Sequence, residues 1–147
     1  MKTIAVLLVF VLVTGCNTKP VSFSSPMLLP QEAAFNCAFK QVNELGYTVT
    51  NADKGAGYLT AEKQTRSHSL GDLGSNTHHD RLTVSIYASD SATRTTRVIA
   101  ASDREEHSLV MVRTAGAKPS DQVRKDAGVL LDACVKAGMR RDAGPAR

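Results

Sequence analysis

One segment in the second half of this chain alternates strictly between apolar and polar residues, and it constrains the fold more than any other feature. The two sets are Leu82, Val84, Ile86 and Ala88 against Thr83, Ser85 and Tyr87. A period of two predicts a β-strand with one apolar face and one polar face. A sheet built from such strands must pack its apolar face against a second layer. The rest of the chain has to supply that layer.

Two segments with helical spacing of apolar residues can supply it. The first is expected to begin near Pro30, to use Glu32 in its first turn, where the helix dipole favours an acid, and to end at Gly46. Its apolar residues are Phe35, Ala38, Phe39, Val42 and Leu45. The second should open with Ser120 as its N-cap and end at Gly138. Its apolar face is predicted to comprise Val123, Ala127, Leu130, Cys134 and Ala137.

The other segments with a period of two predict two hairpins. Residues 47–50 and 58–64 flank a turn-rich stretch of Asn, Asp and Gly, and they form the first hairpin with Leu59 facing the core. Residues 82–88 turn back into a partner strand at residues 95–101, which forms the second hairpin.

Two further segments have less regular patterns. The apolar run Leu109 to Val112 predicts a last strand, although residues 105–112 could instead form a short helix because their period is ambiguous. Residues 66–80 lack a sustained apolar period and contain glycines, serines and three histidines, which predicts a long, mobile loop.

The order helix, hairpin, hairpin, strand, helix predicts an α+β fold. We expect a two-layer sandwich in which an antiparallel sheet of four to five strands carries two helices on one face. A single domain is expected over residues 30–139, followed by a basic tail at residues 140–147. This order resembles the small helix-and-sheet domains of many envelope lipoproteins, including a lipoprotein subunit of the machinery that assembles outer-membrane proteins.

The start of the chain predicts an export signal. The apolar run Ile4 to Val13 is too short to span a bilayer, and Lys2 supplies the positive charge that precedes the apolar part of a signal peptide. The sequence Leu12-Val13-Thr14-Gly15-Cys16 that ends this run resembles the lipobox of bacterial lipoproteins. The resemblance implies that residues 1–15 are a signal peptide that is cleaved before Cys16.

The same resemblance implies a lipid anchor. In that family the cysteine carries a diacylglyceryl group on its thiol and an acyl chain such as palmitate on its amine, which assigns lipidation to Cys16. An aspartate directly after the cysteine commonly retains such proteins in the inner membrane, and this chain has Asn17 instead. The expected location is therefore the outer membrane, facing the periplasm, with the inner membrane or the cell surface as alternatives. Residues 16–29 are rich in Ser and Pro and predict a flexible tether.

The cysteine count agrees with export. The chain has three cysteines, and lipidation of Cys16 leaves Cys37 and Cys134 as a pair in an oxidising compartment, which predicts a disulfide. The two can meet if the first and last helices pack side by side and antiparallel. Two buried free thiols are the alternative, because a free cysteine behaves as a small hydrophobe.

The charge pattern does not select a nucleic-acid partner. Removal of Lys2 with the signal peptide lowers the formal charge from +4 to +3. A mildly basic surface suits anionic lipid head groups, or it serves solubility, since Lys and Arg are interspersed with Asp and Glu. The expected compartment lies outside the cytoplasm and the chain has no basic patch interleaved with aromatic residues, so nucleic-acid binding is not expected.

Catalytic and metal motifs are sparse. The sequence has no Gly-x-Ser-x-Gly elbow, no nucleotide-binding glycine loop and no His-Glu-x-x-His helix, so no catalytic residue is assigned. Ser69, His78 and Asp80 have the residue types of a hydrolase triad, but such residues crowd any polar loop. His68, His78, His79 and Asp80 are weak candidate metal ligands, although the neighbours His78 and His79 would point apart in a strand.

Three classes of function remain in order of weight. The first is a non-enzymatic envelope lipoprotein, without a cofactor, whose domain docks on a protein partner. The second is a small-ligand or metal-binding module that uses residues 66–80. The third is an enzyme, for which the sequence offers no motif.

Overall fold

The computed structural model describes residues 18–27, 29–69, 71, 74–88, 94–108 and 110–142. The elements are β1 (Val21–Met27), α1 (Gln31–Glu44), β2 (Thr48–Asp53), β3 (Tyr58–Ser69), β4 (Ser75–Ala88), β5 (Arg94–His107), β6 (Val112–Ala117) and α2 (Asp121–Asp142). The predicted signal peptide, Cys16 and residues 143–147 of the predicted tail lie outside the described residues.

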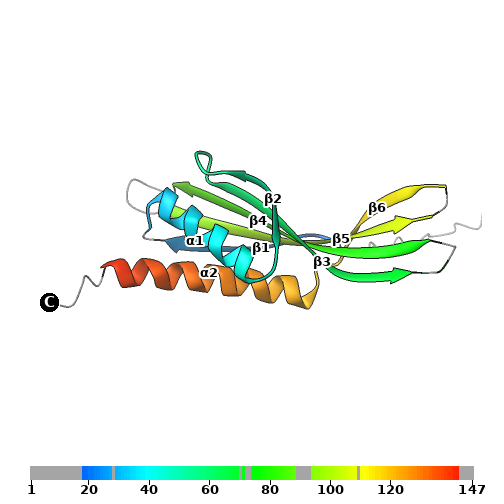
Figure 1. Ribbon diagram of the computed structural model, residues 1–147. Coiled ribbons are helices and arrows are strands. Elements are labelled where there is room, and N and C mark those ends of the chain that lie inside the picture. The colour runs from blue at the N-terminus through cyan, green and yellow to red at the C-terminus, as the bar shows by residue number, and fades with distance from the viewer. Residues whose placement is uncertain are drawn as a thin grey trace, which may run out of the picture.

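The fold is an α+β sandwich, as the sequence predicts. One antiparallel sheet of six strands has the order β1-β5-β4-β3-β2, and β6 also pairs with β5. Both β1 and β6 lie on the edge of β5 that faces away from β4: β1 pairs with residues 94–100 and β6 with residues 102–107. The helices α1 and α2 cover one face of the sheet (Figure 1). We call this the helix-side face and the other the open face.

The core lies between the helices and the helix-side face. Leu82, Val84 and Ile86 of β4 are buried there, which confirms the predicted alternation. The neighbouring strands and the helices contribute further buried residues, among them Leu59, Ala61, Val98, Ala100, Phe35, Ala38, Val42, Val123, Ala127 and Leu130. Phe39, which the helical spacing places on the apolar face of α1, is instead 42% exposed.

The turn between β2 and β3 needs a glycine. The backbone N–H of Ala56 donates a 2.9 Å hydrogen bond to Asp53 Oδ1, and Gly57 has a φ of 65°. A Cβ on Gly57 would lie 2.7 Å from the carbonyl oxygen of Ile86, so glycine avoids both the backbone strain and the clash. The first predicted hairpin is confirmed, with Leu59 inside.

The predicted tether is wrong over residues 21–27, which form β1. Val21, Phe23, Ser25 and Met27 point to the helix-side face, where Met27 is buried, whereas Ser22, Ser24 and Pro26 alternate with them and are exposed. An edge strand tolerates a proline, because the missing N–H removes no hydrogen bond from the interior of the sheet. The serine- and proline-rich composition therefore misled the prediction.

The predicted mobile loop at residues 66–80 is also wrong. β3 continues to Ser69 and β4 begins at Ser75, and the two pair from Arg66 with His78 to Ser69 with Ser75. No described side chain in residues 66–69 and 75–79 is buried, so no apolar period is needed there. Backbone hydrogen bonds and cross-strand side-chain pairs hold these residues as strands.

Two predicted boundaries shift. Residues 105–112 form neither the expected strand at 109–112 nor a helix, because β5 runs to His107 and β6 begins at Val112. Gly138 does not end the last helix, since α2 continues to Asp142 and Gly138 is buried within it. At the other end Ser120 is the N-cap as predicted: its Oγ accepts a 3.0 Å hydrogen bond from the N–H of Val123.

A disulfide joins the two helices. Cys37 of α1 and Cys134 of α2 are bonded, with their Cα atoms 5.7 Å apart and a separation of 97 positions in the sequence. Cys134 is fully buried and Cys37 packs against the same core. α1 and α2 run in roughly opposite directions, as the pairing requires (Figure 1). The predicted cross-link is confirmed, and the alternative of two buried free thiols is wrong.

Tyr47 ties the end of α1 to α2. Its hydroxyl donates a 3.0 Å hydrogen bond to the buried carboxylate of Asp126, which also accepts one from Gln122. Burial of Tyr47 raises the pKa of its phenol well above the ordinary value of 10.0, and the negative charge of Asp126 raises it further.

Reduction of the disulfide should lower the melting temperature, because the cross-link restricts the unfolded chain. The chain-entropy model allows up to about 4.7 kcal/mol for a loop of about 100 residues. Thermal melts with and without reductant measure the effect. The double variant Cys37→Ala, Cys134→Ala is the control, and its melting temperature should not respond to reductant. An unchanged wild-type melt after verified reduction would contradict a stabilising role.

Alkaline pH should destabilise the wild-type protein through Tyr47. The raised pKa keeps the folded phenol neutral, whereas the unfolded phenol ionises near its ordinary value of 10.0, so stability falls as the pH rises above that value. Tyr47→Phe removes the titrating group, and its free energy of unfolding should fall less steeply over the same range. Urea denaturation at several pH values compares the two slopes, and equal slopes would refute the assignment.

Candidate interaction surface

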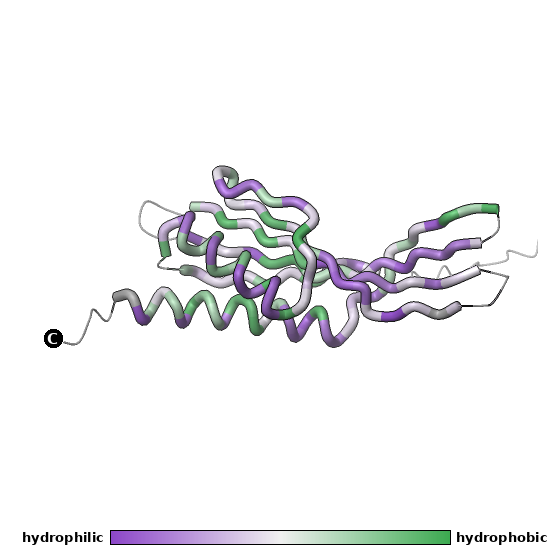
Figure 2. The backbone as a smooth tube through the Cα atoms, viewed as in Figure 1, coloured by the Kyte–Doolittle hydropathy of each residue, from purple (hydrophilic) through white to green (hydrophobic). Residues whose placement is uncertain are grey.

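The ends of four strands extend past the helices. We call residues 65–69 of β3, 75–79 of β4, 103–107 of β5 and all of β6 the projection. Figure 1 shows these strands extending away from the layer that α1 and α2 cover, and Figure 2 shows them to be mostly hydrophilic. None of the projection's described side chains is buried, so both of its faces are available to other molecules.

A buried carboxylate marks the base of the projection on the helix-side face. Asp80 is 2% exposed and accepts hydrogen bonds from the hydroxyls of Ser102, at 2.5 Å, and Ser120, at 2.7 Å. Ser102 Oγ in turn accepts a 3.1 Å hydrogen bond from the N–H of Ser120. Because Ser120 caps α2, this network fixes the N-terminus of the helix to β4 and β5.

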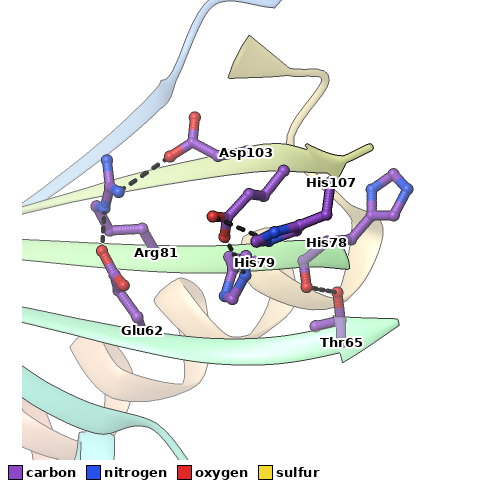
Figure 3. A network of polar contacts seen from close by, with 8 residues as sticks. Glu62, Thr65, His78, His79, Arg81, Asp103 and His107 are labelled. Atoms are coloured by element: carbon purple, nitrogen blue, oxygen red, sulfur yellow. Dashed lines mark hydrogen bonds and ion pairs between the residues drawn. The ribbon is translucent and has the colours of Figure 1, made fainter. Parts of the chain in front are cut away.

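The open face carries a row of ion pairs that runs across three strands, from β3 over β4 to β5. Arg81 lies directly opposite Glu62 and donates to its carboxylate at 2.7 Å, and it reaches Asp103 on the other side at 3.0 Å. The hydrogen bond to Glu62 raises the pKa of Arg81, and the negative charge of Asp103 raises this pKa further. Figure 3 shows Arg81 between the two acids. The side chains are partly exposed, so each pair adds little stability.

A second group lies next to this row, toward the tip of the projection. Glu105 contacts His107 Nε2 at 3.1 Å and His79 Nε2 at 3.6 Å, so one carboxylate holds two imidazoles that come from neighbouring strands. Figure 3 shows His79 and His107 close together and His78 pointing away from them. Glu105 and His107 were not among the residues predicted from the sequence, because residues 103–107 are all polar and have no period of two that would indicate a strand.

The structure does not bring the predicted candidate ligands together. His78 and Asp80 lie on the helix-side face of β4, whereas His79 lies on the open face, because neighbours in a strand point to opposite sides. His68 occupies the β3 position opposite Asn76. Within the ranges that the structure describes, no group of three or more His, Cys, Asp or Glu residues is arranged to hold a metal ion.

The residues of the possible triad are likewise separated. Ser69 pairs with Ser75 near the tip of the projection, on the open face, whereas His78 faces the helix side. The Asp80 carboxylate is occupied by the hydroxyls of Ser102 and Ser120. Ser69, His78 and Asp80 therefore do not form the hydrogen-bonded set that a catalytic triad requires.

A groove of about 780 Å³ lies where the projection meets the N-terminus of α2. Lys63, Arg66 and Lys118 line it together with His78 and Ser120. Its volume is within the range of ligand sites, but such sites are mostly apolar and enclosed. This groove is lined mostly by polar side chains and is open to solvent, so it does not have the form of an enclosed small-molecule site.

Comparisons with known proteins identify no family. No protein-family model and no curated protein matches the sequence. Among solved structures, the chain is similar to a DUF4468 family protein from Bacteroides ovatus ATCC 8483, with 12% identity, coverage of 77% of this chain and 81% of that chain, and a TM-score of 0.36. It is also similar to a TBP-like protein from Parabacteroides distasonis ATCC 8503, with 13% identity, coverage of 86% and 90%, and a TM-score of 0.36. Neither likeness bears on the function of this chain.

Asp80→Ala should destabilise the domain markedly, because it removes two hydrogen bonds to a buried charge and leaves two serine hydroxyls without their acceptor. We expect a loss of about 3 kcal/mol in the free energy of unfolding, measured by urea denaturation. Asp103→Ala is the matched control on the open face and should cost about 0.5 kcal/mol, since it breaks a partly exposed ion pair. Equal losses in the two variants would show that the Asp80 network does not hold α2 in place.

Proposed function

We propose that this protein is exported and held in the cell envelope by lipid on Cys16, and that its folded domain docks on a protein partner without catalysing a reaction. The proposed location is the outer membrane, facing the periplasm. The proposed signal peptide comprises residues 1–15, and the domain has no cofactor besides the covalent lipid.

One observation supports export above the others. The disulfide between Cys37 and Cys134 links the two helices of the domain, and disulfides persist in oxidising compartments outside the cytoplasm. The pairing uses the two cysteines that lie inside the fold and leaves Cys16, in the lipobox-like sequence, as the third. The described part of the chain contains no helix that is long and apolar enough to cross a membrane. A lipid would supply the membrane attachment.

Docking is supported by the form of the projection. β2 pairs only with residues 58–62 of β3, so the described structure places no strand beside residues 66–69 of β3 on the edge that faces away from β4. The edge of β6 that faces away from β5 has no pairing strand among the described residues either. Free strand edges can accept a strand from another protein, with the main chain giving affinity and alternate side chains giving specificity. The Arg81 and Glu105 groups offer charges of both signs on the adjoining open face.

The anchor is tested at Cys16. Cys16→Ser should abolish lipidation, because a hydroxyl does not replace the thiol that receives the diacylglyceryl group. Mass spectrometry of the membrane-extracted protein should find acyl mass on the wild type and none on the variant. The double variant Cys37→Ala, Cys134→Ala is the control and should keep its acyl mass. A wild-type protein with an intact residue 1–15 segment and no acyl mass would refute the anchor.

The partner is tested by photo-crosslinking in intact cells. A p-benzoylphenylalanine at Ser67 or Thr114, one on each free edge of the projection, should give a cross-linked band, because a docked strand would lie within reach of it. The same residue at Lys40 or Lys125, on the helices, is the control and should give none. Bands from the helices alone would place the partner elsewhere, and no band at any position would argue against a stable protein partner.

A further inference from the structure

The turn between β5 and β6 ends the projection with apolar side chains. Val110 is 90% exposed, Met111 62% and Val112 60%, and they are consecutive in sequence. The other large exposed apolar residues of the described structure stand apart from one another on other elements: Phe39, Tyr87, Val129 and Met139. Figure 2 shows the start of β6 as hydrophobic beside hydrophilic strands. We call Val110, Met111 and Val112 the apolar tip.

The apolar tip is held in place by its own turn. The N–H of Ser108 donates a 2.9 Å hydrogen bond to the carbonyl of Met111, and the N–H of Met111 donates a 3.2 Å bond to Ser108 Oγ. Ser108 Oγ also donates to the carbonyl of Met111 at 3.1 Å. Three hydrogen bonds thus close the turn, and the side chains of Val110 and Met111 remain directed into solvent. The exposed side chains of Val110 and Met111 therefore belong to a turn that backbone and side-chain hydrogen bonds close.

The beginning of the described chain lies against the same strand. A Cβ on Gly116 of β6 would lie 3.9 Å from Cβ of Thr18. Cys16 is two residues before Thr18, so at full extension it lies within about 7 Å of Thr18. Gly116 is four residues from Val112, or about 14 Å along a strand. A lipid on Cys16 therefore enters the membrane within about 7 to 20 Å of the apolar tip, depending on the direction of residues 16 and 17.

The charges near this point suit a phospholipid surface. Arg113 follows the apolar tip directly, and Lys19 and Lys118 line a shallow groove beside Val21, next to the start of the described chain. Juxtamembrane lysines and arginines are attracted to anionic head groups. Arg113 is the cation that adjoins the apolar tip, and Glu106 lies opposite it in the β5–β6 ladder. Exposed apolar side chains combined with basic residues are the composition by which amphipathic helices insert into the boundary between head groups and acyl chains, about 5–10 Å deep.

We propose that the apolar tip inserts into the same lipid leaflet that holds the acyl chains of Cys16. This inference rests on the proposed lipidation. The protein then contacts the membrane at two points, one covalent and one formed by the turn, and the projection stands between the bilayer and the helix layer. The occupant of the apolar tip is lipid, because the anchor brings a bilayer within reach of it whether or not a partner is bound.

Tryptophan fluorescence tests the insertion, since the chain has no tryptophan of its own. The lipidated full-length Met111→Trp variant is reconstituted in vesicles of phosphatidylethanolamine and phosphatidylglycerol with brominated acyl chains. Its emission should shift to shorter wavelength and be quenched by the bromine atoms. Val129→Trp is the matched control, because Val129 is 42% exposed on α2, and its emission should neither shift nor be quenched. Thermal melts establish that both variants fold.

Each failure has a separate meaning. Acyl mass on Cys16 with an unquenched Trp at position 111 would overturn the insertion and leave the anchor standing. Absence of acyl mass would overturn the proposed anchor, and with it the inference. Quenching of both tryptophans would mean that the domain lies on the membrane without a specific apolar tip, and this also overturns the proposal. A shift at position 111 that appears only with added envelope proteins would assign the apolar tip to a protein partner instead.

Discussion

The helices of this protein cover only the part of the sheet whose helix-side residues are apolar, and the rest of the structure depends on that limit. Along β4 the buried series Ile86, Val84 and Leu82 ends at Asp80, and beyond Asp80 no residue of the strand is buried. Burial of apolar side chains therefore stabilises β4 only from Leu82 to Ile86, and not beyond Asp80. At that level a hydrogen-bonded carboxylate holds the start of α2, and past it the strands are held by backbone pairing and by polar contacts between side chains, such as those of Glu105.

The small core explains the need for a cross-link. The chain has no tryptophan, and the buried residues are mainly aliphatic, with Phe35 and Tyr47 as the buried aromatic side chains of the described structure. α1 has only four buried residues, Ala34, Phe35, Ala38 and Val42, and two of these are alanines. A helix that buries so little apolar area gains limited packing energy. The disulfide to α2 compensates by limiting the conformations of the unfolded chain.

Helices and strands were predicted correctly from the sequence where apolar residues recur at a regular spacing, and wrongly where they do not. The strands with Leu59 and with Leu82 to Ile86 were predicted correctly, because their buried side chains give the sequence an apolar period. The start of α2 was predicted correctly, because Ser120 forms the capping hydrogen bond that its residue type indicates. β1 was missed because three serines and a proline dominate a strand that buries one side chain fully. The contact of His79 with Glu105 could not be predicted, since it requires the β4–β5 hairpin to continue into residues 75–79, which the sequence predicted to be a loop.

The ladder between β4 and β5 has a mechanical consequence. Every residue from Ser75 to Ala88 pairs with one from His107 to Arg94 without a register shift. The same two strands therefore line the core on the helix-side face and continue into the projection. The β3 ladder has a bulge between Gln64 and Arg66, whereas the central pair keeps one register along its whole length. An uninterrupted backbone ladder thus connects the projection to the part of the sheet that α1 and α2 cover. A force applied at the end of β5 would be carried along this ladder toward the helix layer.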